Sequence, residues 1–443
     1  MKEYLQEKHP LYQAHIAIVG ATNTGKTTLS RLLQGLSIDT ADMMNLGDLS
    51  NGILFNNVKW ENVEPKVNIH IRDFSGVTDF FPSHANFMLN YGFYILVADT
   101  TSEYSASQVE RWLYFIQCKA PNATVLVLGT HIDVKECTDG MKSKAEELFD
   151  LFKERFSNII SIQFINLLDT EQTKKLLKYI PSVIATPTFG QLIPNSWIEF
   201  EEIIKTMFIL REVQRISWNE IKEIVTICDI EEDIILAVLQ HLKDKGSIST
   251  MYPITENFTD YIYSPEFLNE LTIAASVSHG RRETTFDFLV DALKWHPKEC
   301  FELVLEVAEA FDLAFVDREK EKLLIPTGFS YPTSNLEYQF IKAFPAVCSE
   351  GKQEYSRVYD LEYIPLAFSN TLFVRLLYYG TPVVCHRSGM VLQNNEQNYL
   401  LCIKIDLHTD SFEVKYRGSS EEQANSIFAV CDRVIATWDV HVK

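Results

Sequence analysis

The sequence predicts an α/β domain with a doubly wound, mainly parallel sheet, followed by an α+β region that includes a winged-helix subdomain. Three observations lead to this fold class. Apolar strand-like runs alternate with helix-like segments from His15 to about Pro181. Proline and glycine then mark a linker near residue 185. Beyond it, helix, turn, helix and wing signals precede a stretch that is richer in strand signals.

Four strand-like runs and the helices between them justify the α/β assignment. Residues 15–20, 93–98 and 124–128 are almost entirely apolar, which suits strands buried on both faces of a parallel sheet. Residues 67–72 alternate apolar and polar side chains. The helices are expected over residues 26–33, 108–119 and 142–156.

The middle of the chain is expected to be mostly helical. A first helix covers residues 197–210. Ser217 and Glu220 have the spacing of a capping box, so a second helix starts at Ser217 and stops near Cys228. The other elements expected here are a helix over 231–245, a small hairpin of 247–252 with 261–263, and further helix over 286–311.

The C-terminal region is expected to combine strands with one closing helix. Strand signals recur from about residue 330, and they are clearest over 381–385, 399–406 and 412–416. An amphipathic helix follows over 421–438. The many aromatic side chains between residues 329 and 379 are expected in a core rather than around a ligand.

Composition and charge exclude several classes of protein. The 443 residues correspond to about three domains, and the net charge is −20. An acidic chain is a poor general binder of DNA, RNA or anionic lipid, since those partners need a basic surface. The N-terminus has no apolar signal segment, and no apolar run is long enough for a transmembrane segment. The eight cysteines have no metal-site spacing, so we expect reduced thiols and a cytoplasmic location.

The strongest functional signal is a phosphate-binding pattern at residues 20–27, Gly-Ala-Thr-Asn-Thr-Gly-Lys-Thr, which match G-x-x-x-x-G-K-[ST] between a strand and a helix. Glycines let such a loop curl so that its amides point at phosphate oxygens. Lys26 brings positive charge to the β- and γ-phosphates, and the Thr27 hydroxyl completes a magnesium shell. The loop residues expected to contact nucleotide are Gly20, Thr22, Asn23, Thr24, Gly25, Lys26, Thr27 and Thr28.

Two later strings extend this site. Residues 73–76 have the form D-x-x-G after a strand, so Asp73 is expected to hold magnesium through water and the Gly76 amide to meet the γ-phosphate. Thr130, His131 and Asp133 follow the strand at 124–128 as T-H-x-D. The Asp133 carboxylate can accept the two donors on guanine N1 and N2, a pair that adenine lacks. His131 can pack along the base.

The T-H-x-D form, preceded by Val-Leu-Gly, resembles the Roc domain of the Roco family, which includes the leucine-rich-repeat kinases. Residues 73–76 resemble the D-F-x-G of the same domains, and later segments resemble the COR domain that follows Roc. The segments that carry the resemblance are 50–53 with Trp60, 73–76, 83–88, 127–133, 193–197 with Ser217-Trp218, 361–368 and 374–376.

The resemblance implies a Ras-like P-loop GTPase domain at 12–182, a linker at 183–195, a winged-helix COR-A-like subdomain at 196–328 and a COR-B-like subdomain at 329–443. It implies GTP/GDP and Mg²⁺ as ligands, with Lys26, Thr27, Asp73 and Gly76 as catalytic residues. It implies slow GTP hydrolysis coupled to switching of segments 37–56 and 73–90. It also implies protein partners through the COR-like region, with homodimerisation among them.

Three positions depart from the family pattern. Ser50 stands where the family usually has a switch I threonine, although its hydroxyl can still contact magnesium, and Thr40 is a weaker alternative. Val77 stands where many GTPases carry the glutamine that orients the attacking water. Residues 165–168, Ile-Asn-Leu-Leu, replace the S-A-K-like loop that supports guanine specificity.

Three alternative functions follow from other features of the sequence. Val77 favours a nucleotide-bound signalling scaffold with negligible GTPase activity. An ATPase or a nucleotide kinase is disfavoured by Asp133. A nucleic-acid function for the helix-turn-helix at 217–252 is disfavoured because three acidic residues, 231–233, open its second helix and would repel phosphates.

Overall fold

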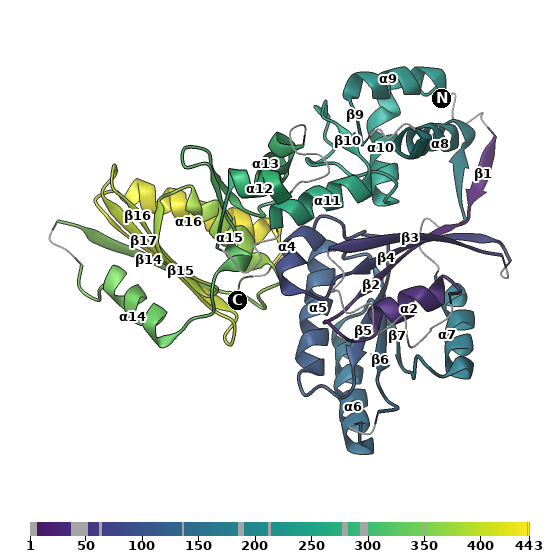
Figure 1. Cartoon of the computed structure of the whole chain (residues 1–443), viewed down its shortest axis with the longest axis horizontal. Coiled ribbons are helices and arrows are strands. Elements are labelled where there is room, and N and C mark those ends of the chain that lie inside the picture. Colours follow the sequence, from purple (N-terminus) through teal and green to yellow (C-terminus); the bar gives the residue numbers. More distant parts are fainter. Residues whose placement is uncertain are drawn as a thin grey trace. The chain divides into compact units, whose positions relative to one another are not determined.

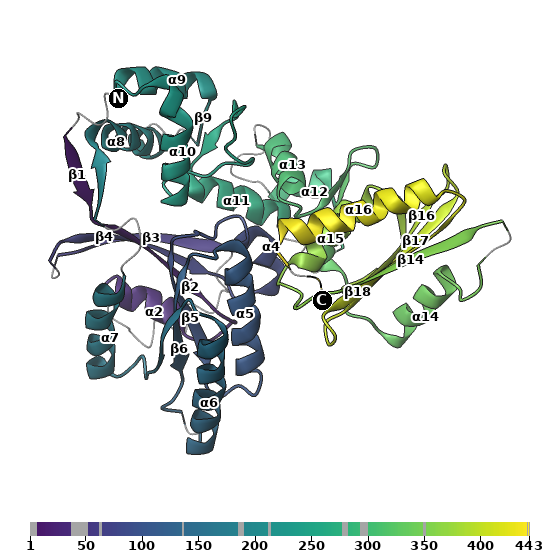
Figure 2. The ribbon, with the colours of Figure 1, turned by 180° about the vertical axis from the view of Figure 1, so that it is seen from behind.

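The computed structural model describes residues 7–36, 52–61, 64–134, 137–184, 190–210, 214–276, 282–292, 300–348, 351–440 and 442. The chain divides into two compact units (Figures 1 and 2). Unit 1 comprises Met1–Val77 and Phe87–Glu270, and unit 2 comprises Thr78–Asn86 and Leu271–Lys443. No helix within the described ranges combines the length and apolar character needed to cross a lipid bilayer.

Unit 1 is built on a six-stranded sheet in the order β3-β4-β2-β5-β6-β7. All neighbouring pairs are parallel except β3 with β4, which is antiparallel. The predicted strands are present and slightly longer than expected, whereas β3 and β7 were not predicted. The strands are β2 (Gln13–Val19), β3 (Ile53–Trp60), β4 (Val67–Phe74), β5 (Phe93–Asp99), β6 (Thr124–Thr130) and β7 (Ile159–Phe164).

Helices pack against this sheet and bury its apolar side chains. The three predicted helices are confirmed as α2 (Lys26–Leu33), α5 (Ser105–Lys119) and α6 (Asp139–Arg155), and α7 (Thr170–Val183) is added. Side chains of α2 and α7 share one core cluster with alternate residues of the strands. Phe93, Ile95 and Val97 of β5 point into that cluster, so the residues between them face the other side, where α5 packs against β5.

A short two-stranded sheet joins the two ends of the α/β region. Strand β1 (Lys8–Leu11) pairs antiparallel with β8 (Gln191–Pro194), with Lys8 opposite Pro194 and Leu11 opposite Gln191. β8 leads directly into α8 (Asn195–Leu210), which confirms the expected helix near residue 197. The segment before β2 and the segment after α7 are therefore held side by side.

Residues 195–270 of unit 1 form a second, mainly helical region with its own apolar cluster. The capping box is confirmed: the Ser217 side chain accepts from the Glu220 amide, and the Glu220 carboxylate accepts from the Ser217 amide at 2.8 Å. The elements after α8 are β9 (Arg215–Ile216), α9 (Trp218–Ile227), η2 (Glu232–Ile234), α10 (Ile235–Asp244), β10 (Ile262–Tyr263) and α11 (Pro265–Ser276).

The expected hairpin of 247–252 with 261–263 is wrong in its first strand. β10 pairs with β9, and only Ser249 bridges to Tyr263. Side chains of this stretch make other contacts. The Ser247 hydroxyl donates to Glu201 of α8 at 2.6 Å, and the Thr250 hydroxyl donates within the stretch, to the Tyr252 carbonyl at 2.7 Å. The first turn of the helix expected from 231 is also a 3-10 turn rather than α-helix.

Unit 2 contains a three-stranded sheet, a five-stranded sheet and their helices. The small sheet has the order β11-β13-β12, and α12 and α13 lie between β11 and β12 in the sequence. The helix expected over 286–311 is α12 and α13, and residues 293–299 between them lie outside the described residues. The elements are β11 (Glu283–Thr285), α12 (Phe286–Ala292), α13 (Phe301–Ala310), β12 (Phe315–Asp317), β13 (Lys322–Leu324) and η3 (Pro326–Gly328).

The five-stranded sheet of unit 2 is antiparallel throughout, in the order β14-β18-β17-β16-β15. α16 packs on β14, β18 and α15. The predicted strands and closing helix are confirmed as β15, β17, β18 and α16. The elements are α14 (Ser334–Ala343), β14 (Gln353–Asp360), α15 (Phe368–Leu377), β15 (Thr381–His386), β16 (Gly389–Asn394), β17 (Tyr399–Asp406), β18 (Ser411–Gly418) and α16 (Glu421–Thr437).

The segment 78–86 packs within unit 2, although it lies between β4 and β5 in the chain. It folds as η1 (Thr78–Phe80) and α4 (Phe81–His84), which contact η3 and α15. The Arg387 guanidinium donates to Asp79 Oδ1 at 3.1 Å and to the Thr327 carbonyl at 2.7 Å.

Candidate nucleotide-binding site

The loop at residues 20–27 has a backbone that its glycines make possible. Gly20 follows β2 with φ of 143°, and Gly25 precedes α2 with φ of 90°. A Cβ at Gly20 would lie 2.2 Å from the Val97 carbonyl oxygen, so β5 leaves no room for a side chain there. Asn23 also has a positive φ, of 60°. Both glycines of the motif are therefore required by backbone geometry.

The basic residue of the loop is buried at the start of α2. Lys26 is 6% exposed, and its ammonium group donates to the Ala21 carbonyl across the loop. Burial lowers the pKa of Lys26 to about 8, and the nearby Asp73 carboxylate raises it. The Thr24 hydroxyl donates to the same Ala21 carbonyl at 3.0 Å. Thr27 and Thr28 follow in the first turn of α2, where the helix N-terminus favours negative charge.

Asp73 brings a buried carboxylate to the same place from the end of β4. It is 1% exposed, and neither of its oxygens accepts a hydrogen bond of normal geometry from the described residues. Burial raises the pKa of Asp73 to about 6, while the Lys26 ammonium and the Thr27 hydroxyl pull that pKa down. A buried carboxylate with unused oxygens beside a threonine hydroxyl is a donor set that suits a hard divalent cation.

Gly76 lies directly against the phosphate-binding loop. A Cβ at Gly76 would be 2.4 Å from the Thr22 amide nitrogen and 2.8 Å from the Ala21 carbonyl oxygen. The fourth position of D-x-x-G thus has to be glycine for the two segments to approach each other. Residues more than fifty positions apart in the sequence therefore meet at one loop.

The T-H-x-D segment is also fastened to the loop, through Thr130. Its hydroxyl donates to the Thr24 carbonyl at 2.8 Å and contacts the Ala98 carbonyl at 3.1 Å. His131 has φ of 59°, and its Nδ1 lies 3.2 Å from Asp99 Oδ1. Asp133 follows in an exposed turn. The structure thus brings the start of the segment to the loop and leaves the Asp133 side chain open to solvent.

Two residues near this site were not singled out from the sequence. Asp99 ends β5 and accepts from the Thr101 amide at 2.9 Å, from the Thr101 hydroxyl at 2.6 Å and from His131. Burial favours the neutral acid, but these hydrogen bonds outweigh it and keep the pKa of Asp99 below its usual value. Leu167, in the loop 165–168, packs against Gly25. A Cβ at Gly25 would lie 3.0 Å from Leu167 Cδ1.

Of these two residues, only Asp99 could have been identified as a site residue from the sequence. It is the first acidic residue after the apolar run 93–98, and the carboxyl ends of parallel strands gather at one edge of a sheet. Leu167 carries no such signal, because it contributes packing rather than polar chemistry. Val77 is partly exposed and its amide lies 3.3 Å from the Ser75 hydroxyl. The expected switch I residues Ser50 and Thr40 lie outside the described residues.

Comparison with known proteins adds a family to this geometry. The family model described as "Ras of Complex, Roc, domain of DAPkinase" matches residues 15–133. The probable serine/threonine-protein kinase pats1 of Dictyostelium discoideum is 23% identical over 453 residues, covering 95% of this chain and 14% of that protein. Leucine-rich repeat serine/threonine-protein kinase 1 of Mus musculus is 22% identical over 424 residues, covering 81% of this chain and 20% of that protein. The chain thus spans a fifth or less of the length of these two relatives.

A solved structure matches across most of the chain. The structure of Methanosarcina barkeri Roco2 RocCORdC bound to GDP aligns with a TM-score of 0.57 at 19% identity, covering 73% of this chain and 98% of that one. At this identity the match establishes a shared fold. Residues 15–133 thus match the Roc family, the relatives are Roco proteins, and the chain has the fold of a Roc–COR tandem, a P-loop GTPase domain followed by a COR region.

Proposed function

We propose that this Roco-type GTP-binding protein hydrolyses GTP slowly and uses the nucleotide state to change contacts made by its COR region. The observation that carries the proposal is the convergence of three segments on one loop. Gly76 abuts Thr22, Thr130 donates to Thr24, and Asp73 lies close enough to Lys26 for their charges to interact. These segments are far apart in the sequence, and one guanine nucleotide with its metal ion accounts for all three.

Each residue of the loop has a task in holding phosphate. The amides of residues 20–27 and the N-terminus of α2 provide fixed positive dipoles for the β- and γ-phosphates. Lys26 adds a full charge at the same place and stabilises the leaving phosphate. Its pKa of about 8 leaves it mainly protonated at neutral pH. Gly20 and Thr22 to Thr28 are thus proposed as the phosphate-binding residues.

Asp73, Thr27 and, in switch I, Ser50 are proposed as the residues that hold Mg²⁺, with Asp73 acting through water. The buried, unused carboxylate oxygens of Asp73 fit this role. When bound, magnesium neutralises charge that develops on the phosphates. The Gly76 amide is proposed to meet the γ-phosphate, because Gly76 is held against Thr22 without an intervening side chain.

The base is proposed to be read by the T-H-x-D segment. The Asp133 carboxylate would accept from the N1 and N2 groups of guanine, and the Thr130 contact to Thr24 supports a position for it beside the loop. His131 is held by Asp99 and would pack along the base.

The switch is proposed to run from the D-x-x-G segment into the COR region. Residues 73–77 belong to unit 1 and residues 78–86 pack within unit 2, so a change at Gly76 would be passed on along a continuous stretch of chain. The domain boundaries at 12–182, 196–328 and 329–443 and self-association of the C-terminal half belong to the same proposal.

Nucleotide titrations of the purified chain test this function. Fluorescent GDP should bind in the presence of Mg²⁺, excess ATP should fail to displace it, and Lys26→Ala should abolish binding. Asp133→Asn should weaken guanine nucleotide and favour xanthine nucleotide, because the amide cannot accept from both guanine donors. Displacement by ATP as effective as by GTP would refute guanine specificity.

A signalling scaffold with negligible turnover is the second candidate. Val77 favours it, since its side chain cannot hydrogen-bond the attacking water. A single-turnover measurement with GTP-loaded protein separates the two candidates. Phosphate release at the uncatalysed rate would favour the scaffold, whereas faster release would establish the GTPase.

A further inference from the structure

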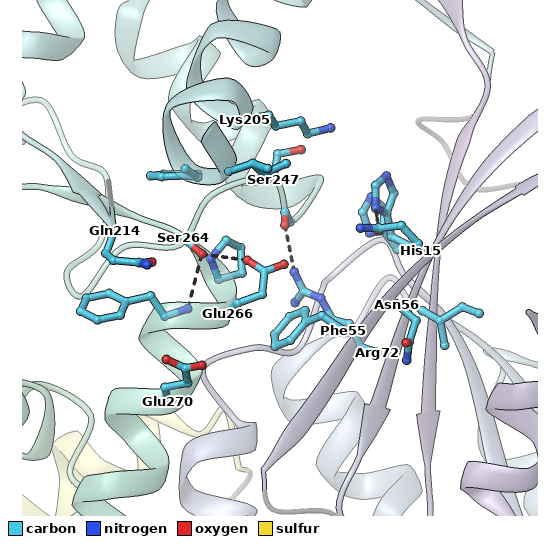
Figure 3. A pocket seen from close by; sticks show the side chains of 18 residues that line it. His15, Phe55, Asn56, Arg72, Lys205, Gln214, Ser247, Ser264, Glu266 and Glu270 are labelled. Carbon is cyan, nitrogen blue, oxygen red and sulfur yellow. Dashed lines mark hydrogen bonds between the residues drawn. The ribbon is translucent and has the colours of Figure 1, made fainter. Parts of the chain in front are cut away.

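Arg72 is a buried cation one residue before Asp73, and the candidate nucleotide site makes no use of it. It is 4% exposed. Side chains alternate across a strand, so Arg72 and Asp73 point to opposite faces of β4. Asp73 faces the phosphate-binding loop, while Arg72 faces the helical region formed by residues 195–270 (Figure 3). Burial lowers the pKa of Arg72 to about 10, which leaves the guanidinium charged at neutral pH.

The guanidinium joins three segments of unit 1. Its Nη1 donates to the Phe87 carbonyl at 2.6 Å. Its Nη2 donates to the Gly246 carbonyl at 3.1 Å (Figure 3). It also lies over the Phe55 ring of β3, 5.4 Å from the ring centroid. Both of these hydrogen-bond acceptors are main-chain carbonyls, so the guanidinium fixes backbone positions, while the Glu266 carboxylate interacts with its charge without a hydrogen bond.

The contact with Phe87 closes the loop that contains the D-x-x-G segment. Residues 73–86 leave unit 1 after Val77 and return to it at Phe87. Arg72 precedes this stretch and Phe87 follows it, so one guanidinium fastens both of its ends. The side chain that ties the two ends of this stretch together is itself bonded to Gly246.

Gly246 lies directly against the Arg72 guanidinium. It follows α10 with φ of 73°, and a Cβ there would lie 2.3 Å from Arg72 Nη2 and 3.1 Å from Arg72 Cζ. A cavity of about 340 Å³ next to it is lined by Arg72, Phe55 and Gly246 among others. A displaced guanidinium would have space there, so a side chain at Gly246 would shift Arg72 rather than be blocked outright.

A second contact ties the neighbouring strand to the same helical region. The Asn269 side-chain amide of α11 donates to the Ile53 carbonyl of β3 at 3.1 Å. Strand β3 pairs with β4 along its whole length, with Leu54 opposite Asp73. The helical region thus holds both the strand that carries Asp73 and the strand beside it.

We propose that Arg72 is a positioning residue for the γ-phosphate-sensing segment, and that the Gly246 carbonyl makes this positioning depend on the helical region at 195–270. The inference rests on the proposed function. Arg72 touches neither nucleotide nor metal in this scheme. It acts by fixing the ends of residues 73–86, so it affects the site only where that segment contributes, namely at magnesium and the γ-phosphate.

This role predicts a selective defect. Arg72→Lys retains the charge but cannot span two carbonyls in a planar fork. We expect the affinity for a non-hydrolysable GTP analogue to fall about tenfold, the size expected for one lost charge-assisted hydrogen bond, and that for GDP to change less than about twofold. A purely structural role would lower the melting temperature and weaken both nucleotides alike.

Gly246→Ala tests the same link from the far side, and Gly351→Ala is its control. Gly351 has φ of 79°, close to that of Gly246, but a Cβ there would meet none of the described residues within 4 Å. Both substitutions thus place alanine in the same unfavourable backbone region, and only one displaces Arg72. We expect Gly246→Ala to reproduce the selective loss of GTP analogue and Gly351→Ala to leave the ratio of the two affinities unchanged.

The outcomes are distinguishable from failure of the proposed function. If the unmodified chain binds neither GDP nor the analogue, the guanine-nucleotide function itself fails, and this inference with it. If it binds both and Gly246→Ala retains the wild-type ratio of affinities, or both nucleotides weaken in parallel, the positioning role of Arg72 is refuted while the nucleotide function stands. Should Arg72→Lys fail to fold, Gly246→Ala decides alone.

Discussion

Replacing Asp73 by asparagine should make the nucleotide-free protein more stable while removing its response to magnesium. In the folded chain, burial raises the pKa of Asp73 from 3.8 to about 6. A raised carboxyl pKa favours the folded state fully below the unfolded pKa, and this contribution is lost as the pH rises through 6. Above that pH, the ionised carboxylate destabilises the fold by about 3 kcal/mol, since one pKa unit corresponds to about 1.36 kcal/mol. Asparagine keeps the shape and has no charge to bury.

The advantage of Asp73→Asn should depend on pH in a defined way. From the two pKa values, it is at most about 3 kcal/mol at pH 7.5 and about 1 kcal/mol at pH 4.5. Hydrogen exchange of peptides that cover β4 and α2 reports this local stability in nucleotide-free protein. Asp150→Asn, on an exposed position of α6, is the matched control and should change stability by less than about 0.5 kcal/mol.

Two results would contradict a destabilising, ionised Asp73. Lower protection of Asp73→Asn than of wild type at pH 7.5 would mean that the carboxylate has a stabilising partner. An advantage that stays constant between pH 7.5 and 4.5 would mean that ionisation is not its cause. In the same samples, adding EDTA should weaken binding of a non-hydrolysable GTP analogue to wild type and leave its binding to the variant unchanged.

Three further substitutions test other contacts. Thr130→Val leaves the Thr24 carbonyl without its donor and should weaken GDP about tenfold in a fluorescence titration; unchanged affinity would contradict the role of this contact. Burial favours neutral Glu201, but the buried Lys245 ammonium outweighs it and holds the pKa of Glu201 at about 2, so its stabilising effect is present above pH 4.5 and lost as the pH falls toward 2. Glu201→Gln should thus cost about 3 kcal/mol in urea unfolding at pH 7 and about half as much at pH 3. Ser217→Ala should cost about 1 kcal/mol, seen as a lower melting temperature, because it removes an N-cap.

Local patterns predicted those elements of the fold that local physics controls. The helix at Lys26 begins where the loop motif ends, and β5 and β6 were evident as apolar runs because both of their faces are buried. Strand β3 has mixed polarity, since it lies at the edge of its sheet, and no periodic pattern distinguishes it from a loop. The wing was overestimated because Ser247 bonds to a distant helix, which no local pattern encodes.

The candidate site shows the same division between local and long-range information. The sequence motifs alone identified the loop, Asp73, Gly76 and Asp133 as candidate site residues. The motifs could not predict the contact between Thr130 and Thr24, which are 106 positions apart. Nor could they predict the contact between Arg72 and Gly246, which are 174 positions apart. Such contacts arise only once the sheet has assembled, so they require the structure.

The pairing of β1 with β8 has a mechanical consequence. Because the two strands are antiparallel and Lys8 lies opposite Pro194, tension that pulls these two ends away from each other loads the ladder at one end. The hydrogen bonds between β1 and β8 then break one after another, whereas under a shearing force they would bear the load together. When the α/β region is stretched between these ends, the β1–β8 pair should therefore separate at a lower force than the six-stranded sheet.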